Sequence, residues 1–329
     1  MSRPGRGALL LLLLLAVAVA SGLLLGAASL SPTEVWRALT GQEVGPAART
    51  IVLSLRLPRV TAAAFTGVAL TISGTLFQAL LRNPLAEPYL LGVSSGAALG
   101  AVLALTVFGG VLGYVGTVGF ALAGGLAAIA IVFRVALSVG RLDTHILILA
   151  GVVVAAFFGA GVMLVLSLAE PDATRAAVLW TMGSLERAGW ESTGTLALAA
   201  VAGGASAFAL SRHLNALALG EEAAAYLGAR VEAVRRSAYF IASLLAAVAV
   251  STAGVIGFVG LVIPHAARMI WGSDHRHLLP LGALGGAAAL VLADTLARVA
   301  LRPLELPVGV VTALLGVPFF LVLLRRSHA

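Results

Sequence analysis

Long apolar runs recur along the whole chain, separated by short stretches that contain arginine, glycine or proline. Ten runs can be counted, at 8–28, 60–81, 93–109, 111–133, 144–168, 193–210, 237–258, 259–272, 278–297 and 307–324. A helix needs about 20 mainly apolar residues to cross a bilayer, and its backbone groups must be paired within the segment. The pattern predicts one all-α domain over residues 1–329, a polytopic membrane bundle of about ten transmembrane helices. Glycine and proline make the boundaries least certain within 93–133 and 237–272.

The composition agrees with a lipid-embedded protein. Hydrophobic residues make up 60% of the chain, charged residues only 11%, and the mean hydropathy is +1.06. Soluble domains carry about 25% charged residues. The net charge of +7 comes from arginines scattered singly or in pairs between apolar runs, so we expect membrane lipid and no nucleic acid as a partner.

The chain lacks two residue types, and the absence of each excludes a kind of site. The chain has no lysine, so it lacks the lysine with which a P-loop holds nucleotide phosphates. It has no cysteine, which excludes disulfides and thiolate metal sites. The histidines lack the spacing of a helical metal pair, and we expect no metal site, no cofactor bound by this chain and no catalytic residue.

The two ends of the chain bear on its orientation. Arg3 and Arg6 precede the run at 8–28, which can be a cleaved signal peptide or the first spanning helix. Its length favours a helix. Ten spans place both termini on one side, and that side then holds 13 of the 21 arginines, so the positive-inside rule predicts cytoplasmic termini in a bacterial inner membrane.

Three residue pairs share an offset of 180 positions. They suggest an inverted repeat of the kind found in transporters, although chance can produce three matches in a glycine-rich chain. The pairs are Gly74 with Gly254, Pro84 with Pro264, and Gly92 with Gly272.

Three polar stretches are candidates for function. Arg56-Leu57-Pro58-Arg59 opens the second run on the side predicted to be poor in arginine. The arginines can be snorkelling side chains, or they can project from a rigid rim toward carboxylates of a soluble partner.

The second stretch lies in the longest predicted cytoplasmic loop, 211–236. Gly220 and Gly228 bracket a short helix with acidic residues in its first turn, where the helix dipole favours them. It can be a plain loop helix, or its alanine face can dock in a groove on a partner protein.

The third stretch, Arg82 to Pro88, contains two prolines that cannot lie inside a regular helix. It can be an ordinary turn, or it can line a water-filled path, where non-helical backbone is tolerated at membrane depth. Elsewhere, Asp294 and Arg298 lie four residues apart and suggest an ion pair or a rim feature.

Taken together, these stretches resemble the FecCD-type permeases that import iron–siderophore complexes, haem and cobalamin by ABC transport. The resemblance covers nearly the whole chain in order. It is carried by Arg56-Leu57-Pro58-Arg59, Asn83-Pro84-Leu85-Ala86-Glu87-Pro88, Leu91-Gly92-Val93-Ser94-Ser95-Gly96-Ala97, Met182-Gly183-Ser184, Ala218-Leu219-Gly220-Glu221, Val262-Ile263-Pro264-His265, Asp274-His275-Arg276 and Glu305-Leu306-Pro307-Val308-Gly309.

The resemblance implies a homodimer with the path on its two-fold axis. It also implies two cytoplasmic ATPase subunits, which use ATP and magnesium, and a periplasmic or lipid-anchored binding protein. Docking of that protein is implied for Arg56, Arg59 and Arg298, and ATPase coupling for Leu219, Gly220, Glu221, Glu222, Ala224 and Gly228. A gate or pathway is implied for Asn83, Pro84, Leu85, Thr144 and His145, where His145 departs from the small hydroxyl residue that can occur at this place.

We therefore expect a transporter subunit rather than an enzyme, with a ferric siderophore as first choice of cargo and cobalamin or haem as alternatives. The competing hypothesis is a secondary transporter driven by an ion gradient. Such a protein normally carries ionisable residues in the middle of its helices, where this chain has almost no acids.

Overall fold

The computed structural model describes residues 3–108, 111–139 and 142–327, and within these ranges the regular secondary structure is helical, apart from an isolated bridge between Leu301 and Leu304. The all-α prediction is confirmed. The elements are α1 (Arg3–Leu24), α2 (Pro32–Thr40), α3 (Pro46–Thr50), the π-helical turn η1 (Ile51–Arg56), α4 (Leu57–Leu80), η2 (Pro88–Leu91), α5 (Val93–Thr106), α6 (Gly113–Ala136), η3 (Leu137–Val139), α7 (Thr144–Leu168), α8 (Pro171–Thr181), α9 (Trp190–Ala209), α10 (Ser211–Ala218), α11 (Glu221–Tyr226), α12 (Val231–Ala253), α13 (Val259–Trp271), α14 (His275–Val299) and α15 (Val308–Ser327).

Each of the ten predicted apolar runs corresponds to one helix. In the described residues seven helical segments are long and apolar enough to span a bilayer, and they contain α1, α4, α6, α7, α9, α12 and α14. The apolar helices α5, α13 and α15 are shorter. The chain is a multi-pass membrane protein. The boundaries differ most from the prediction in α1, which runs from Arg3 to Leu24 rather than over 8–28, and in α12, which runs from Val231 to Ala253 rather than over 237–258. The helix α12 begins early because its polar first turns pair with neighbouring segments.

Several helices begin at a side chain that caps free backbone N–H groups, as expected for helix N-termini. Ser31 and Glu34 form a capping box at α2, Asp143 accepts from the first turn of α7, and Asp274 accepts from the first turn of α14. These caps place the starts of two spanning helices at defined residues.

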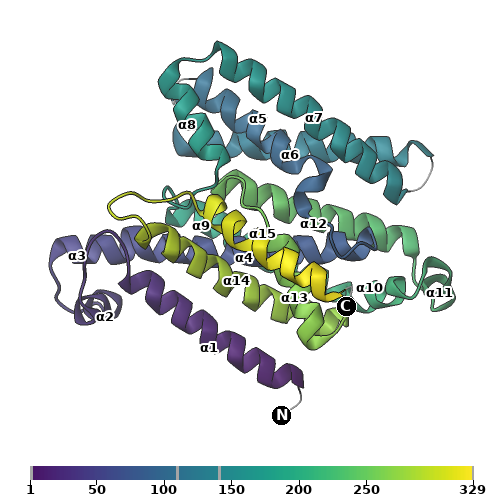
Figure 1. Cartoon of the computed structure of the whole chain (residues 1–329), viewed down its shortest axis with the longest axis horizontal. Helices are drawn as coiled ribbons and strands as arrows, with labels where there is room; N and C mark the ends of the chain where they lie inside the picture. Colours follow the sequence, from purple (N-terminus) through teal and green to yellow (C-terminus); the bar gives the residue numbers. More distant parts are fainter. Residues whose placement is uncertain (1–2, 109–110, 140–141, 328–329) are drawn as a thin grey trace.

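The helices α4, α12 and α14 form the interior of the bundle, and α1 and α7 lie on opposite flanks (Figure 1). In the most apolar window, 78% of the α4 residues are buried, against 22% for α1 and 28% for α7. Glycine allows the inner helices to approach closely, because a methyl group added at Gly67 would collide with the Gly286 carbonyl, and one added at Gly74 with the Gly260 carbonyl.

Two of the three residue pairs that suggested a repeat lie in different local structures. Gly74 is inside α4, whereas Gly254 ends α12 with a φ of 70°. Pro84 lies in a turn, and Pro264 lies inside α13. In the third pair, Gly92 ends η2 with a φ of 77° and Gly272 ends α13 with a φ of 90°. The inverted repeat remains a prediction.

The bundle has two distinct ends. Figure 1 shows α10 and α11 at one end, together with the start of α1 and the end of α15, while α2, α3 and α8 lie at the other. We call these the α11 end and the α8 end. Both termini lie at the same end, as an even number of spans requires.

Candidate functional site

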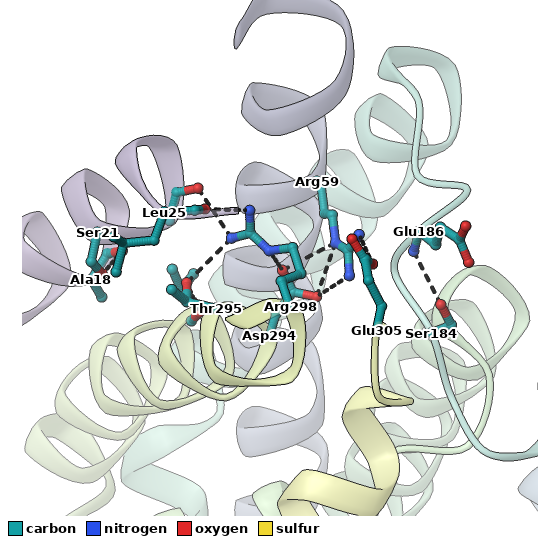
Figure 2. A network of polar contacts seen from close by, with 12 residues as sticks. Ala18, Ser21, Leu25, Arg59, Ser184, Glu186, Asp294, Thr295, Arg298 and Glu305 are labelled. Carbon is teal, nitrogen blue, oxygen red and sulfur yellow. Dashed lines mark hydrogen bonds and ion pairs between the residues drawn. The ribbon is translucent and has the colours of Figure 1, made fainter. Parts of the chain in front are cut away.

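At the α8 end, the carboxylate of Asp294 lies between two arginines (Figure 2). The Arg59 Nε donates to both carboxylate oxygens at 3.0 and 3.1 Å, and the Arg298 Nε lies 3.1 Å from Oδ2. Asp294 is only 1% exposed, and a buried carboxylate requires such partners. Asp294 and Arg298 are one turn apart on α14, so the ion pair suggested by their spacing is confirmed.

A second carboxylate completes the cluster. Glu305 precedes α15, and its Oε2 lies 2.7 Å from Nη1 of Arg59. Its side chain is 30% exposed, so Glu305 is the accessible member of the cluster.

Two arginines of this region also cap the C-terminal end of α1. Arg56 donates to the carbonyl oxygens of Leu23, Leu24 and Ala28, and Arg298 donates to those of Gly22 and Leu25. The last carbonyls of a helix lack intrahelical partners and carry the negative end of its dipole, which explains their preference for cations.

In the structure the arginines do not project from an exposed rim, which was one of the two possibilities for the Arg56–Arg59 stretch. Arg56, Arg59 and Arg298 are 5%, 9% and 3% exposed, and each is bound to groups of its own chain. The physical reason is local: the end of α1 needs donors and Asp294 needs cations. Their role in docking a partner protein remains a prediction.

At the α11 end, the predicted short helix is present as α11. It lies between Gly220, with a φ of 123°, and Gly228, with a φ of 79°, and both angles favour glycine. Ala224 is fully buried against its own chain, whereas Ala225 is exposed and Ala223 is half-buried, so docking of an alanine face on a partner remains a prediction.

The outward surface of this loop is formed by larger side chains. Leu219, Tyr226 and Leu227 are 72%, 93% and 67% exposed, and Glu222 is exposed beside them. We call Leu219, Tyr226 and Leu227 the α11 patch. Tyr226 and Leu227 were not among the predicted site residues, although three large apolar residues in a polar loop are a detectable signal for a contact surface.

The predicted gate residues lie on two segments at the same end. Asn83, Pro84 and Leu85 form an exposed turn after α4, in which Asn83 Oδ1 accepts from the Leu85 N–H at 2.9 Å. Thr144 and His145 form the first turn of α7, and the His145 N–H donates to Asp143.

The two segments are joined by ion pairs. Glu221 of α11 lies 2.9 Å from Nη1 of Arg235 and 3.7 Å from Nη2 of Arg82, the residue before Asn83. The Nη2 of Arg235 donates to the Thr144 hydroxyl at 3.0 Å. The structure therefore connects the turn after α4, α11 and the start of α7.

The neighbouring helix α10 is attached to α14. Asn215 donates to Asp274 at 2.6 Å and accepts from the His275 N–H at 2.9 Å. The hydrogen bonds from the Arg276 guanidinium hold the pKa of Asp274 well below its usual range, so this carboxylate is charged at neutral pH.

Inside the bundle, side chains satisfy the irregular backbone between α12 and α13. Glu87 accepts from the Phe258 N–H at 2.8 Å, and the Tyr89 hydroxyl donates to the Ile256 carbonyl at 2.8 Å. Phe258 has a φ of 68°, which is rare for an aromatic residue. Non-helical backbone at this depth is thus covered by protein, as the membrane requires.

Among the residues that the structure describes, no three His, Asp or Glu side chains lie close enough together to bind a metal ion. The expectation of no metal and no cofactor remains a prediction. Most of the polar contacts described above instead join helices at the two ends of the bundle.

The comparisons with known proteins agree along almost the entire chain. The model of the FecCD transport family matches residues 11–326. The cobalamin import system permease protein BtuC of Halobacterium salinarum is 43% identical over 297 residues, which cover 88% of this chain and 79% of that protein. The hemin transport system permease protein HmuU of Yersinia pestis is 41% identical, with 97% and 94% covered.

A solved structure shows the same fold. It is described as an inward-facing conformation of an ABC transporter of the metal-chelate type, with a TM-score of 0.87 and 33% identity over 98% of this chain and 99% of that one. With a family model that matches nearly the whole length and two relatives above 40% identity, the chain belongs to the FecCD transport family.

Proposed function

We propose that this chain is the translocating permease subunit of an ATP-binding-cassette importer that carries a metal chelate across the cytoplasmic membrane. The chain works as a homodimer with two cytoplasmic ATPase subunits and a periplasmic or lipid-anchored binding protein. It binds no cofactor itself, because ATP and magnesium are used by the ATPase. The lack of any lysine supports this division of labour.

The observation that carries the proposal is the α11 patch. Large apolar side chains outside the membrane are costly to expose unless a partner covers them, and all three residues of the patch are more than 65% exposed. The positive-inside count assigns the α11 end to the cytoplasm, where an ATPase is accessible. Glu222 lies beside the patch and adds a charge at its margin.

The α8 end is the proposed docking surface for the binding protein. A carboxylate of the partner reaches Arg59 most directly, because it can displace Glu305, whose side chain is 30% exposed. Arg56 and Arg298 support this site through their positive charge while they hold α1 in place. Three arginines face two carboxylates here, which leaves a net positive charge that attracts an acidic partner.

The cargo is a metal chelate, with a ferric siderophore as first choice and cobalamin or haem as alternatives. The two relatives are named for different cargoes at nearly equal identity to this chain, so we expect selection to lie mainly with the binding protein. The cargo is identified by offering the cognate binding protein a ferric siderophore, cobalamin and haem, and by measuring which of them it retains.

The function is tested in proteoliposomes that contain this chain and its ATPase subunit. We expect uptake of chelate that requires ATP, stops with vanadate and persists when an ionophore dissipates ion gradients. Uptake that persists in vanadate and stops with the ionophore would instead establish the secondary transporter.

Docking is tested with a substitution that keeps the cluster folded. Replacing Arg56 or Arg59 by glutamate would disrupt buried contacts and confuse stability with binding. Glu305→Gln frees Arg59 without burying a new charge, so we expect the loaded binding protein to bind more tightly. An unchanged dissociation constant would refute displacement of Glu305 as the docking step.

A further inference from the structure

The first turns of α12 hold the start of α7 at two points. The N–H of Leu142 donates to Oε1 of Glu232 at 3.2 Å, and Nη2 of Arg235 donates to the Thr144 hydroxyl at 3.0 Å. Leu142 is fully buried. The beginning of α7 therefore cannot shift without changing its contacts with α12.

Arg235 is a buried cation with one carboxylate partner. Its side chain is 8% exposed, Nη1 lies 2.9 Å from Glu221, and Nε has no hydrogen-bond partner among the described residues. A buried guanidinium without a carboxylate is strongly disfavoured. The position of Arg235 is therefore tied to the position of Glu221 on α11.

Glu221 itself is exposed and has a second cation within reach. Its Oε1 lies 3.7 Å from Nη2 of Arg82, and both of these side chains are nearly half exposed. Arg82 precedes the Asn83–Leu85 turn and has a φ of 48°. A small movement of α11 along the membrane surface changes how this carboxylate is shared between the two arginines.

We propose that Arg235 is a positioning residue that transmits the position of α11 to the first turn of α7, with the Glu221 carboxylate as the connecting group. This inference rests on the proposed function, because it assigns α11 movement to the ATPase. Arg235 does not belong to the α11 patch and is buried, so its effect on transport does not arise from contact with the ATPase. Arg235 acts on Thr144, and the Glu221–Arg82 contact carries the same movement to the turn after α4.

The geometry explains why an arginine is required. One guanidinium group donates to a carboxylate through Nη1 and to a hydroxyl through Nη2, which a lysine ammonium cannot do in the same fixed fork. Arg235→Lys retains the charge that Glu221 needs and loses the fixed geometry toward Thr144.

The test uses the absence of cysteine in the chain. His145→Cys, in the exposed first turn of α7, provides a single labelling site next to Thr144. The rate of maleimide labelling is measured in the complex with the ATPase, without nucleotide and in the vanadate-trapped state. Every variant is made in this background, so the effect of the reporter itself cancels.

With Arg235 intact we expect a change of at least about tenfold in labelling rate between the two states. In Arg235→Gln and Arg235→Lys we expect the two rates to agree within about twofold, while the ATPase remains bound and hydrolyses ATP. The matched control is Arg230→Gln, since Arg230 is an exposed arginine at the N-cap of the same helix and forms an ion pair with neither Glu221 nor Glu232 among the described residues. The control should retain the full change.

The inference is overturned if Arg235→Lys retains the change, or if Arg230→Gln loses it to the same extent. It is also overturned if the labelling rate does not depend on nucleotide when Arg235 is intact. If Arg235→Gln does not fold, the labelling rates of Arg235→Lys still test the inference, because this variant retains the buried charge. Failure of the proposed function is a separate result: it requires that uptake by the intact complex does not depend on ATP.

Discussion

The substitution Asp294→Asn tests the cluster that joins α1, α4 and α14. It keeps the size of the side chain and removes the charge that lies 3.0 Å from Arg59 and 3.1 Å from Arg298. Two buried guanidinium groups then lose their shared partner, and only Arg59 retains a carboxylate, that of Glu305.

The size of the effect follows from the distances and the burial. Two unit charges 3 Å apart interact by about 5 kcal/mol at an effective dielectric of 20. Removing one partner of a buried ion pair typically costs about 3–5 kcal/mol, because the other charge is left uncompensated. Since Asp294 is 1% exposed, we expect the free energy of unfolding to fall by about 3–5 kcal/mol.

Reversible unfolding in mixed micelles, driven by titration with SDS, measures this loss. Glu305→Gln is the matched control, because it removes a carboxylate from the same Arg59 at a site that is 30% exposed. We expect that variant to lose less than about 1 kcal/mol. If the free energy of unfolding falls by less than about 1 kcal/mol in Asp294→Asn, or by equal amounts in the two variants, the cluster is not the main interaction that holds these helices together.

Three further predictions concern the patch, the packing and the orientation. Tyr226→Glu should weaken binding of the ATPase at least tenfold without lowering the stability of the chain, as measured by co-purification and unfolding; intact binding would exclude the α11 patch as the contact. Gly67→Val should cost about 1–3 kcal/mol in the unfolding assay, since the new side chain meets the Gly286 carbonyl, and unchanged stability would contradict the close approach. Single cysteines at Leu219 and Glu186 should react with an impermeant maleimide from the cytoplasmic and the opposite side respectively, and the reverse pattern would invert the proposed topology.

Much of the fold could be predicted from the sequence, because in lipid every spanning segment must be apolar and internally hydrogen-bonded. The ten runs became ten helices, and the start of α7 at Thr144 agrees with the prediction. The start of α12 was missed because its first turns are polar: Arg235 and Glu232 lengthen the helix through contacts with other segments that no local pattern reveals.

The sequence could indicate which segments are polar or irregular, but not which of their side chains are buried. Gly220 and Gly228 indicated a short helix, yet the face it presents depends on tertiary packing, which buries Ala224 and exposes Tyr226. The position of Arg56 at the end of the bundle opposite α11 could be predicted from the sequence, but its burial depends on the free carbonyls of α1, some 30 residues earlier in the chain. Spacing identifies pairs within one helix, such as Asp294 with Arg298, and is silent about partners on other helices.

The most direct test of the account is uptake of chelate by this chain in proteoliposomes, with and without its ATPase subunit. The account predicts accumulation against a gradient only when the ATPase and ATP are both present. Accumulation by the chain alone, with no companion subunit, would contradict it.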